Sequence, residues 1–120
     1  MIEFINFHKI SDVCLDIFPF GGCNTSLEAL EQNTPVVTLP SKFINGRFTY
    51  GFYKKMGIVD CICSSVEEYI QLALKLGTDK EFNRVIRKKI SNKKDLLFND
   101  QDSIQEWSNK LIMLSTKINI

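Results

Sequence analysis

The sequence lacks the strong charge, the long hydrophobic stretches and the N-terminal signal that several classes of protein need. Its 15 basic and 14 acidic residues give a formal net charge of +1, so no basic excess favours nucleic acid binding. The apolar stretches are far shorter than a membrane span, and no charged segment followed by an apolar one opens the chain. We therefore expect a cytoplasmic protein with no membrane span and no nucleic acid partner.

Metal-binding and reactive side chains are also few. His8 is the single histidine, and the four cysteines are Cys14, Cys23, Cys61 and Cys63. The last two are separated by one residue, whereas zinc sites usually use the wider Cys-x-x-Cys spacing. Without a secretion signal the even count of cysteines does not argue for disulfides. We expect buried free thiols and no metal site, and we expect His8 to serve packing or to face solvent.

The length of the chain sets a limit on its organisation. A chain of 120 residues with 44% hydrophobic residues has the size of one domain with one core. Two full domains with a cleft between them need a longer chain. We therefore predict that residues 1–120 form a single domain.

The hydrophobic pattern alternates between strands and helices before it becomes purely helical. An α/β fold is predicted, with a Rossmann-like parallel sheet, crossover helices and a helical C-terminal tail. Residues 1–9 fit a helix, although they also alternate like a strand. Strands are predicted at 13–17, 35–39 and 58–62, and the later helices at 24–33, 47–56, 65–77, 78–90 and 104–118.

Three Ser/Thr-x-x-Glu patterns predict where helices begin. They lie at residues 25–28, 65–68 and 78–81. In such a capping box the hydroxyl and the carboxylate each accept a hydrogen bond from an otherwise free backbone N–H group.

One segment, residues 16–28, indicates chemistry. A strand ends, Gly21 and Gly22 give a tight turn, and a helix follows. Free N–H groups and the positive end of a helix dipole then lie at the carboxyl end of a parallel sheet, which favours phosphate. The spacing matches neither Gly-x-Gly-x-x-Gly nor a P-loop, so from spacing alone a well-capped strand-to-helix turn is the favoured explanation. Glu28 either closes its capping box or binds ribose hydroxyls.

A longer series of motifs resembles a known family. The motifs occupy residues 12–16, 18–22, 24–30 and 34–40, and the resemblance continues at 46–47, 55–57, 65–69, 76–79 and 104–111. In this order they resemble the C-terminal catalytic region of the O-GlcNAc transferase/Spindly glycosyltransferases, closest to bacterial members with tetratricopeptide repeats. The resemblance covers roughly residues 10–114.

The resemblance implies the C-terminal half of a GT-B fold, in which two Rossmann-like domains hold the donor between them. It implies inverting transfer of a sugar to Ser or Thr, without a metal or other cofactor, from UDP-GlcNAc or a similar donor such as GDP-fucose. The helix dipole would stabilise the negative charge that develops on the leaving diphosphate. The implied partners are a nucleotide sugar, a protein acceptor and a chain that supplies the N-terminal half.

Position by position, the resemblance assigns residues to the donor. It places Cys23, Asn24 and Thr25 at the diphosphate and Glu28 at the ribose. Relatives often carry other residues at Cys23 and Asn24, and Glu28 is one methylene longer than aspartate, so donor binding is expected to differ. The complete predicted diphosphate site is Gly21, Gly22, Cys23, Asn24, Thr25 and Ser26.

Other parts of the family's active site lie upstream of the matched region. The phosphate-binding lysine, the base-binding elements, the N-terminal domain with its candidate base and the repeats have no counterpart here, so no catalytic residue is assigned. Lys42 and Arg47 are candidates for an auxiliary role near the same end of the sheet, or ordinary solvated charges. The rival hypotheses are a non-catalytic remnant or interaction module of GT-B ancestry, and a small phosphate-binding α/β protein.

Two further patterns concern surfaces. A basic cluster is interpreted as a solvated helix face rather than a contact for an acidic surface, since acidic residues lie beside it. The last helix carries an apolar stripe at alternating steps of three and four, which predicts packing in the core or against another domain. The cluster comprises Arg84, Arg87, Lys88, Lys89, Lys93 and Lys94, and the stripe Ile104, Trp107, Leu111, Leu114 and Ile118.

Overall fold

A small parallel sheet organises the computed structural model, which describes residues 2–118. Its strands, β1 (Cys14–Leu15) and β2 (Val36–Val37), pair in parallel. The Asp16 N–H extends this ladder by donating to the backbone of β2, and Thr38 forms a parallel bridge to Ile62. Both β2 side chains are fully buried, as expected for a strand covered on both faces. The predicted parallel sheet is confirmed, with shorter strands than the pattern indicated.

The third predicted strand, at residues 58–62, is wrong except for its last residue. Helix α3 (Phe48–Met56) ends in a left-handed glycine, and the chain then turns so that the Ile62 N–H donates to a carbonyl three residues earlier. The Val36 N–H, on the edge of β2 where a third strand would pair, donates instead to the Tyr53 hydroxyl at 2.8 Å. A buried side chain of α3 thus replaces a strand partner.

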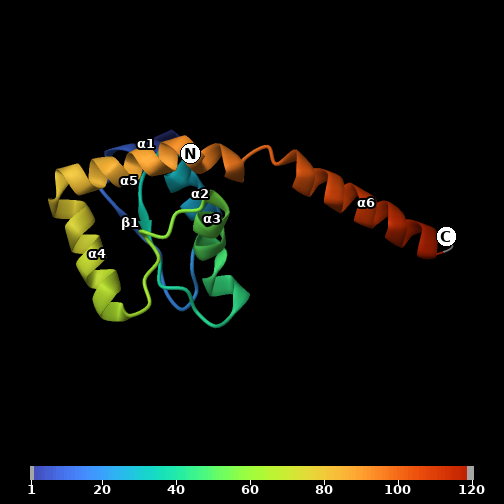
Figure 1. Ribbon diagram of the computed structural model, residues 1–120, viewed down its shortest axis with the longest axis horizontal. Coiled ribbons are helices and arrows are strands. Elements are labelled where there is room, and N and C mark those ends of the chain that lie inside the picture. The colour runs from blue at the N-terminus through green and yellow to red at the C-terminus, as the bar shows by residue number, and fades with distance from the viewer. Residues whose placement is uncertain (1, 119–120) are drawn as a thin grey trace.

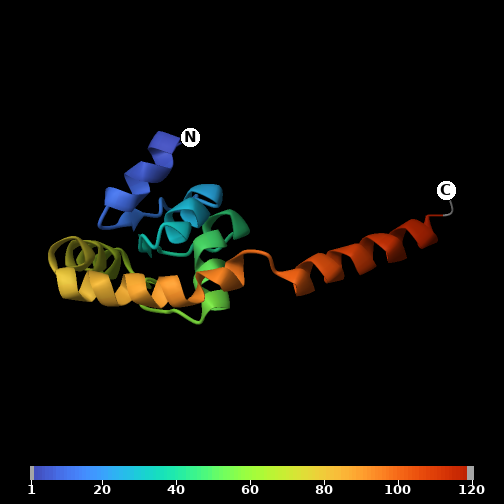
Figure 2. The same cartoon turned by 90° about the horizontal axis from the view of Figure 1, so that it is seen from above.

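The helices follow the predicted order. The segment predicted from residue 1 to 9 is a helix within the described residues, while Met1 lies outside them. In Figure 1 and Figure 2 the helices surround the sheet, and α5 runs along one side of the body. Besides α3 they are α1 (Ile2–Ile10), α2 (Asn24–Glu31), α4 (Val66–Thr78), α5 (Lys80–Lys93) and α6 (Gln101–Lys117), with short 3-10 turns at η1 (Ile44–Gly46) and η2 (Lys94–Leu97).

Two of the predicted capping boxes can be compared at α4 and α5. The Ser65 hydroxyl caps α4 by accepting from the Glu68 N–H at 3.1 Å, as predicted. The Glu68 carboxylate accepts from the N–H and hydroxyl of Ser64, one residue earlier than the box requires. Helix α5 is capped by Asp79, so the prediction of Thr78 is wrong by one residue. An aspartate accepts from the helix N–H groups more strongly than a threonine whose hydroxyl already bonds within α4.

The core lies between the sheet and helices α2 to α5. The buried hydrophobic side chains form one cluster, in which the largest fully buried members come from four different helices. These members are Leu30, Tyr53, Leu76, Ile86 and Ile90. The chain before α6 therefore has its own core.

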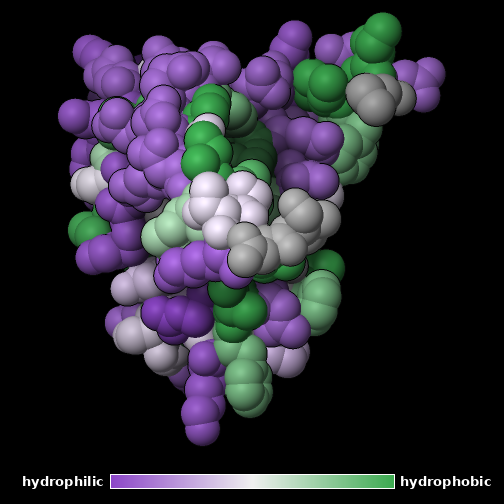
Figure 3. Space-filling view, turned by 90° about the vertical axis from the view of Figure 1, so that its right-hand side faces the viewer, coloured by the Kyte–Doolittle hydropathy of each residue, from purple (hydrophilic) through white to green (hydrophobic). Residues whose placement is uncertain are grey.

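Helix α6 projects from this body, as Figure 1 and Figure 2 both show. None of its residues is buried, and the side chains of its apolar stripe are between 43% and 69% exposed. Seen from the side on which α6 projects, Figure 3 shows hydrophobic side chains gathered between hydrophilic ones. The expectation that this stripe joins the core of the chain is wrong, and packing against another domain stays a prediction. No helix within residues 2–118 is long and apolar enough to cross a membrane.

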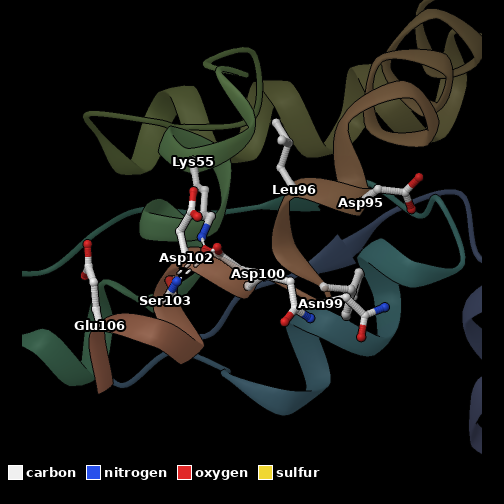
Figure 4. A pocket seen from close by; sticks show the side chains of 10 residues that line it. Lys55, Asp95, Leu96, Asn99, Asp100, Asp102, Ser103 and Glu106 are labelled. Atoms are coloured by element: carbon white, nitrogen blue, oxygen red, sulfur yellow. Dashed lines mark hydrogen bonds and ion pairs between the residues drawn. The ribbon is translucent and has the colours of Figure 1, made fainter. Parts of the chain in front are cut away.

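The start of α6 is attached to the body by charged side chains. Figure 4 shows Lys55 of α3 pointing toward Asp100, with which it forms an ion pair. Asp100 also caps α6 by accepting from the N–H and the hydroxyl of Ser103. The Lys55 ammonium and these Ser103 donors lower the pKa of Asp100 well below its usual range. This junction holds the first residues of α6 against the body. The rest of the helix is not covered by other parts of the described chain.

Replacing Tyr53 by Phe tests whether its hydroxyl substitutes for a strand. Tyr53→Phe leaves the buried Val36 N–H without its partner, so the free energy of unfolding should fall by about 1–3 kcal/mol. The matched control is Tyr50→Phe in the same helix, at a half-buried ring. Urea denaturation followed by circular dichroism measures both. Equal stability of the two variants would contradict this role of the hydroxyl.

Candidate functional site

The candidate site lies where β1 and β2 end and two loops meet. Residues 16–23 connect β1 to α2, and residues 38–47 connect β2 to α3. The Gly21 N–H of the first loop donates to the Asn45 carbonyl of the second at 3.0 Å. A Cβ on Gly46 would lie 2.2 Å from the Pro19 carbonyl, so the loops approach closely only because this position is glycine. The carboxyl ends of the parallel strands thus carry one joined surface.

A buried carboxylate connects these loops. Asp16, 6% exposed, follows directly after β1. Its Oδ1 accepts from the Gly22 N–H and its Oδ2 from the Thr38 hydroxyl, each at 2.7 Å. The Asp16 carbonyl accepts from the Tyr69 hydroxyl of α4 at 2.9 Å. Sequence reasoning missed this residue, although an aspartate between an apolar strand and a glycine turn is a known signal for local hydrogen bonding.

The two predicted glycines have close neighbours. A Cβ on Gly21 would lie 3.0 Å from Oδ1 of Asp16. A Cβ on Gly22 would lie 2.5 Å from the Thr25 hydroxyl and 2.9 Å from the Ser26 hydroxyl, shorter than real Cβ contacts. The turn therefore needs glycine at position 22 for space.

Helix α2 begins without a side-chain cap. Cys23 occupies the N-cap position and forms no capping hydrogen bond, so the predicted box of Thr25 and Glu28 is wrong. The first intrahelical bond runs from the Leu27 N–H to the Cys23 carbonyl, which leaves the N–H groups of residues 24–26 without a helix partner. Helices α4, α5 and α6 are each capped by a side chain. The α2 terminus thus keeps free donors and the positive end of its dipole at the joined loops.

The structure separates the predicted site residues by exposure. Asn24 and Thr25 are exposed at the start of α2, and Cys23 and Glu28 are half-buried. Ser26 is buried, and its hydroxyl accepts from Thr49 of α3 at 2.7 Å. That hydroxyl connects α2 to α3, so Ser26 has a backbone N–H rather than a side chain available at the helix end.

The two auxiliary candidates differ in their surroundings. Lys42 is exposed. Arg47 is half-buried, donates from Nη1 to the Ser41 carbonyl at 2.9 Å and lies over the Tyr50 ring, 4.5 Å from its centroid. Arg47 therefore shapes the second loop, while Lys42 keeps a solvated charge near the same end of the sheet.

An apolar rim borders the glycine turn. We use this name for Ile17 and Phe20 of the first loop and Phe43 and Ile44 of the second. Their exposed fractions run from 68% to 76%. Large apolar side chains exposed together on two joined loops are typical of a surface that a ligand or another domain covers.

Most side chains of the predicted basic cluster form hydrogen bonds or ion pairs with other groups of the same chain. This finding favours the interpretation of a local, solvated face. The bonds join Arg84 to Glu81, Lys89 to Asp60, Lys94 to the Glu31 carbonyl and Arg87 to the Ser11 carbonyl.

One hollow on the surface is a poor place for an anion. A pocket of about 570 Å³ lies at the start of α6, shown in Figure 4. Asp95, Asp100, Asp102 and Glu106 line it with a single cation, Lys55, which already pairs with Asp100. Like charges would repel a diphosphate there. Helices α2 and α3 both begin without a side-chain cap at the joined loops, and of these α2 follows the glycine turn.

The four cysteines are free thiols, and burial works against nucleophilic or metal chemistry at Cys14, Cys61 and Cys63, while Cys14 and Cys23 are less buried than predicted. Cys61 and Cys63 are buried. Burial raises the pKa of Cys61 to about 12 and also raises that of Cys14. The thiolate is the reactive and metal-binding form, and burial disfavours it. Among the described residues no group of His, Cys, Asp and Glu side chains has an arrangement that could hold a metal ion.

Adding a methyl group at Gly22 tests the crowding of the turn. Gly22→Ala should lower the free energy of unfolding by about 1–3 kcal/mol, because the new Cβ overlaps the Thr25 and Ser26 hydroxyls. Gly51→Ala in α3 is the control, since a Cβ there meets nothing within 4 Å and a helical alanine stabilises by up to about 1 kcal/mol. Chemical denaturation measures both. A neutral Gly22→Ala would refute the close approach.

Comparison with known proteins agrees with the resemblance seen in the sequence. The family model for glycosyl transferase family 41 matches residues 2–107. The UDP-N-acetylglucosamine–peptide N-acetylglucosaminyltransferase of Caenorhabditis elegans is 28% identical over 88 residues, which is 73% of this chain and 8% of that protein. The corresponding protein of Giardia intestinalis is 29% identical over 112 residues, 93% of this chain and 7% of that protein.

A solved structure extends the match to three dimensions. A mutant O-GlcNAc transferase of Thermobaculum terrenum superposes with a TM-score of 0.80 at 31% sequence identity, covering 93% of this chain and 22% of that one. The chain thus spans less than a tenth of these curated relatives and about a fifth of the solved enzyme. It belongs to glycosyl transferase family 41, with the α/β architecture of the C-terminal half of a GT-B fold.

Proposed function

We propose that this chain is the nucleotide-sugar-binding part of a protein O-glycosyltransferase. The donor is UDP-GlcNAc or a similar nucleotide sugar, and the acceptor is a Ser or Thr hydroxyl. The observation that carries the proposal is the uncapped start of α2 beside the glycine turn, at the carboxyl end of the parallel strands. The family relationship supports the same reading.

The chemistry follows from where negative charge develops. In an inverting transfer the acceptor oxygen attacks the anomeric carbon while the bond from this carbon to the diphosphate breaks, and the diphosphate leaves with the bonding electrons. The N–H groups of Asn24, Thr25 and Ser26 and the α2 dipole stabilise that charge. Thr25 adds an exposed hydroxyl donor at the same helix end.

The rest of the donor has candidate contacts nearby. Glu28 is half-buried one turn along α2, and in the described residues its carboxylate forms no hydrogen bond or ion pair, so it is available to ribose hydroxyls. In this proposal the helix end supplies the positive charge that a metal gives other glycosyltransferases. In this proposal the catalytic base belongs to the other half of the cleft, and the exposed apolar rim is the surface that this half covers.

A second candidate function is an interaction module of GT-B ancestry. The uncovered apolar stripe of α6 favours it, because an amphipathic helix without a partner is a typical docking element. The two candidates make opposite predictions about donor binding.

Titration calorimetry with UDP, UDP-GlcNAc and GDP-fucose tests the enzyme proposal. The full chain should bind at least one uracil or guanine nucleotide, and the sugar nucleotide should compete with its nucleoside diphosphate, because both occupy the α2 terminus. No binding at millimolar ligand, by the chain alone or with a candidate N-terminal half, would contradict the proposal and favour the interaction module.

A substitution at Glu28 tests the ribose contact. Glu28→Gln should weaken UDP binding roughly tenfold, since a hydrogen bond to a charged acceptor contributes about 1.5–3 kcal/mol. Binding of 2′,3′-dideoxy-UDP, which lacks the hydroxyls, should not change. Glu31→Gln is the control on the exposed face of α2. An equal loss of affinity for both nucleotides would mean that Glu28 does not bind the ribose hydroxyls.

A further inference from the structure

Asp16 is unusual in its burial and in its lack of an ionic partner. Within residues 2–118 no other aspartate, glutamate, lysine or arginine is buried. The salt bridges among these residues do not include it. A buried carboxylate costs free energy unless donors surround it, and here the donors are the Gly22 N–H and the Thr38 hydroxyl. An apolar residue would fill the same space at a lower cost in desolvation free energy. The presence of a carboxylate is therefore best explained by the turn that it holds in place.

We propose that Asp16 is a positioning residue for the donor diphosphate, an inference that rests on the proposed function. By accepting from the Gly22 N–H, Oδ1 fixes the turn immediately before α2. The direction of the free N–H groups of Asn24 and Thr25 depends on how the chain enters the helix. A fixed entry aims these donors before the ligand arrives, which is the condition for effective stabilisation of developing charge.

The carboxylate is itself held from two sides. Oδ2 accepts from Thr38, at the end of β2, and the backbone carbonyl of Asp16 accepts from Tyr69 of α4. The Phe18 ring packs edge-on against Tyr69 with centroids 5.2 Å apart. The sheet and α4, which are both parts of the core, thus fix the position of the Gly22 N–H through Asp16. The exposed loops do not determine it.

The role is geometric rather than electrostatic. A negative charge next to the turn opposes the charge of a diphosphate, so it cannot itself attract the ligand. By accepting from the Gly22 N–H, the carboxylate removes this donor from the ligand and leaves the donors of the first turn of α2. An uncharged group with the same hydrogen bonds should therefore replace Asp16 without loss of phosphate binding.

The test compares Asp16→Asn with Asp16→Ala in the full chain. In Asp16→Asn the amide oxygen can accept from Gly22 and the amide N–H₂ can donate to the Thr38 oxygen, whereas alanine loses both bonds. Calorimetry measures the affinities for UDP and for uridine. The ratio of the two affinities gives the contribution of the diphosphate to binding. The ratio should fall about tenfold or more in Asp16→Ala and stay within about threefold of wild type in Asp16→Asn. Asp12→Ala, an exposed aspartate before β1, is the control and should keep the ratio.

A change of folding stability alone would affect both ligands equally and leave the ratio constant. Should Asp16→Ala not fold, Thr38→Val removes the support of Oδ2, and its ratio should fall by a smaller factor. A wild-type ratio in Asp16→Ala or Thr38→Val, or a failure of Asp16→Asn to keep it, overturns the positioning role while UDP binding by the wild type still stands. Failure of the wild-type chain to bind UDP overturns the proposed function and this inference with it.

Discussion

The hydrogen bond from the Gly22 N–H to the Asp16 carboxylate is the interaction on which the candidate site depends. It joins the end of β1 to the turn before α2, and the same carboxylate reaches the end of β2 through Thr38. Tyr69 fixes its backbone from α4. The end of β1, the glycine turn, the end of β2 and helix α4 thus meet at one buried residue. The two joined loops above Asp16 are therefore held in place by the core, although loops are usually more mobile than the elements they connect.

A helix end is a suitable anion site for a chain whose charges almost cancel. The formal charge of +1 provides no field that attracts a diphosphate, and most of the basic cluster on α5 and η2 is bonded within the chain. Positive potential must therefore be local. The uncapped first turn of α2 provides it at the end of the sheet, while the acidic pocket at the start of α6 does not.

Local patterns predicted the parts of the fold that local chemistry decides. The parallel α/β order, the helix that ends at Met56 and the Ser65 cap were all readable from the sequence. Errors arose where a distant residue intervenes. The third strand was wrong because the Tyr53 hydroxyl takes the Val36 N–H, and Ser26 turns inward because Thr49 binds it. No role was predicted for Asp16, because two of its partners, Thr38 and Tyr69, lie 22 and 53 residues away. The stripe of α6 was recognisable, but its partner is not in the core of this chain.

Nuclear magnetic resonance of the backbone amides during a titration with UDP tests the central claim most directly. The account predicts that the amide signals of Asn24, Thr25 and Ser26 shift most, and that uridine shifts them far less, because the phosphates bind these N–H groups. The Gly22 amide should remain protected from exchange throughout, since its N–H stays hydrogen-bonded to the Asp16 carboxylate. Shifts confined to the pocket between α3 and α6, or equal shifts with UDP and uridine at α2, would contradict the account.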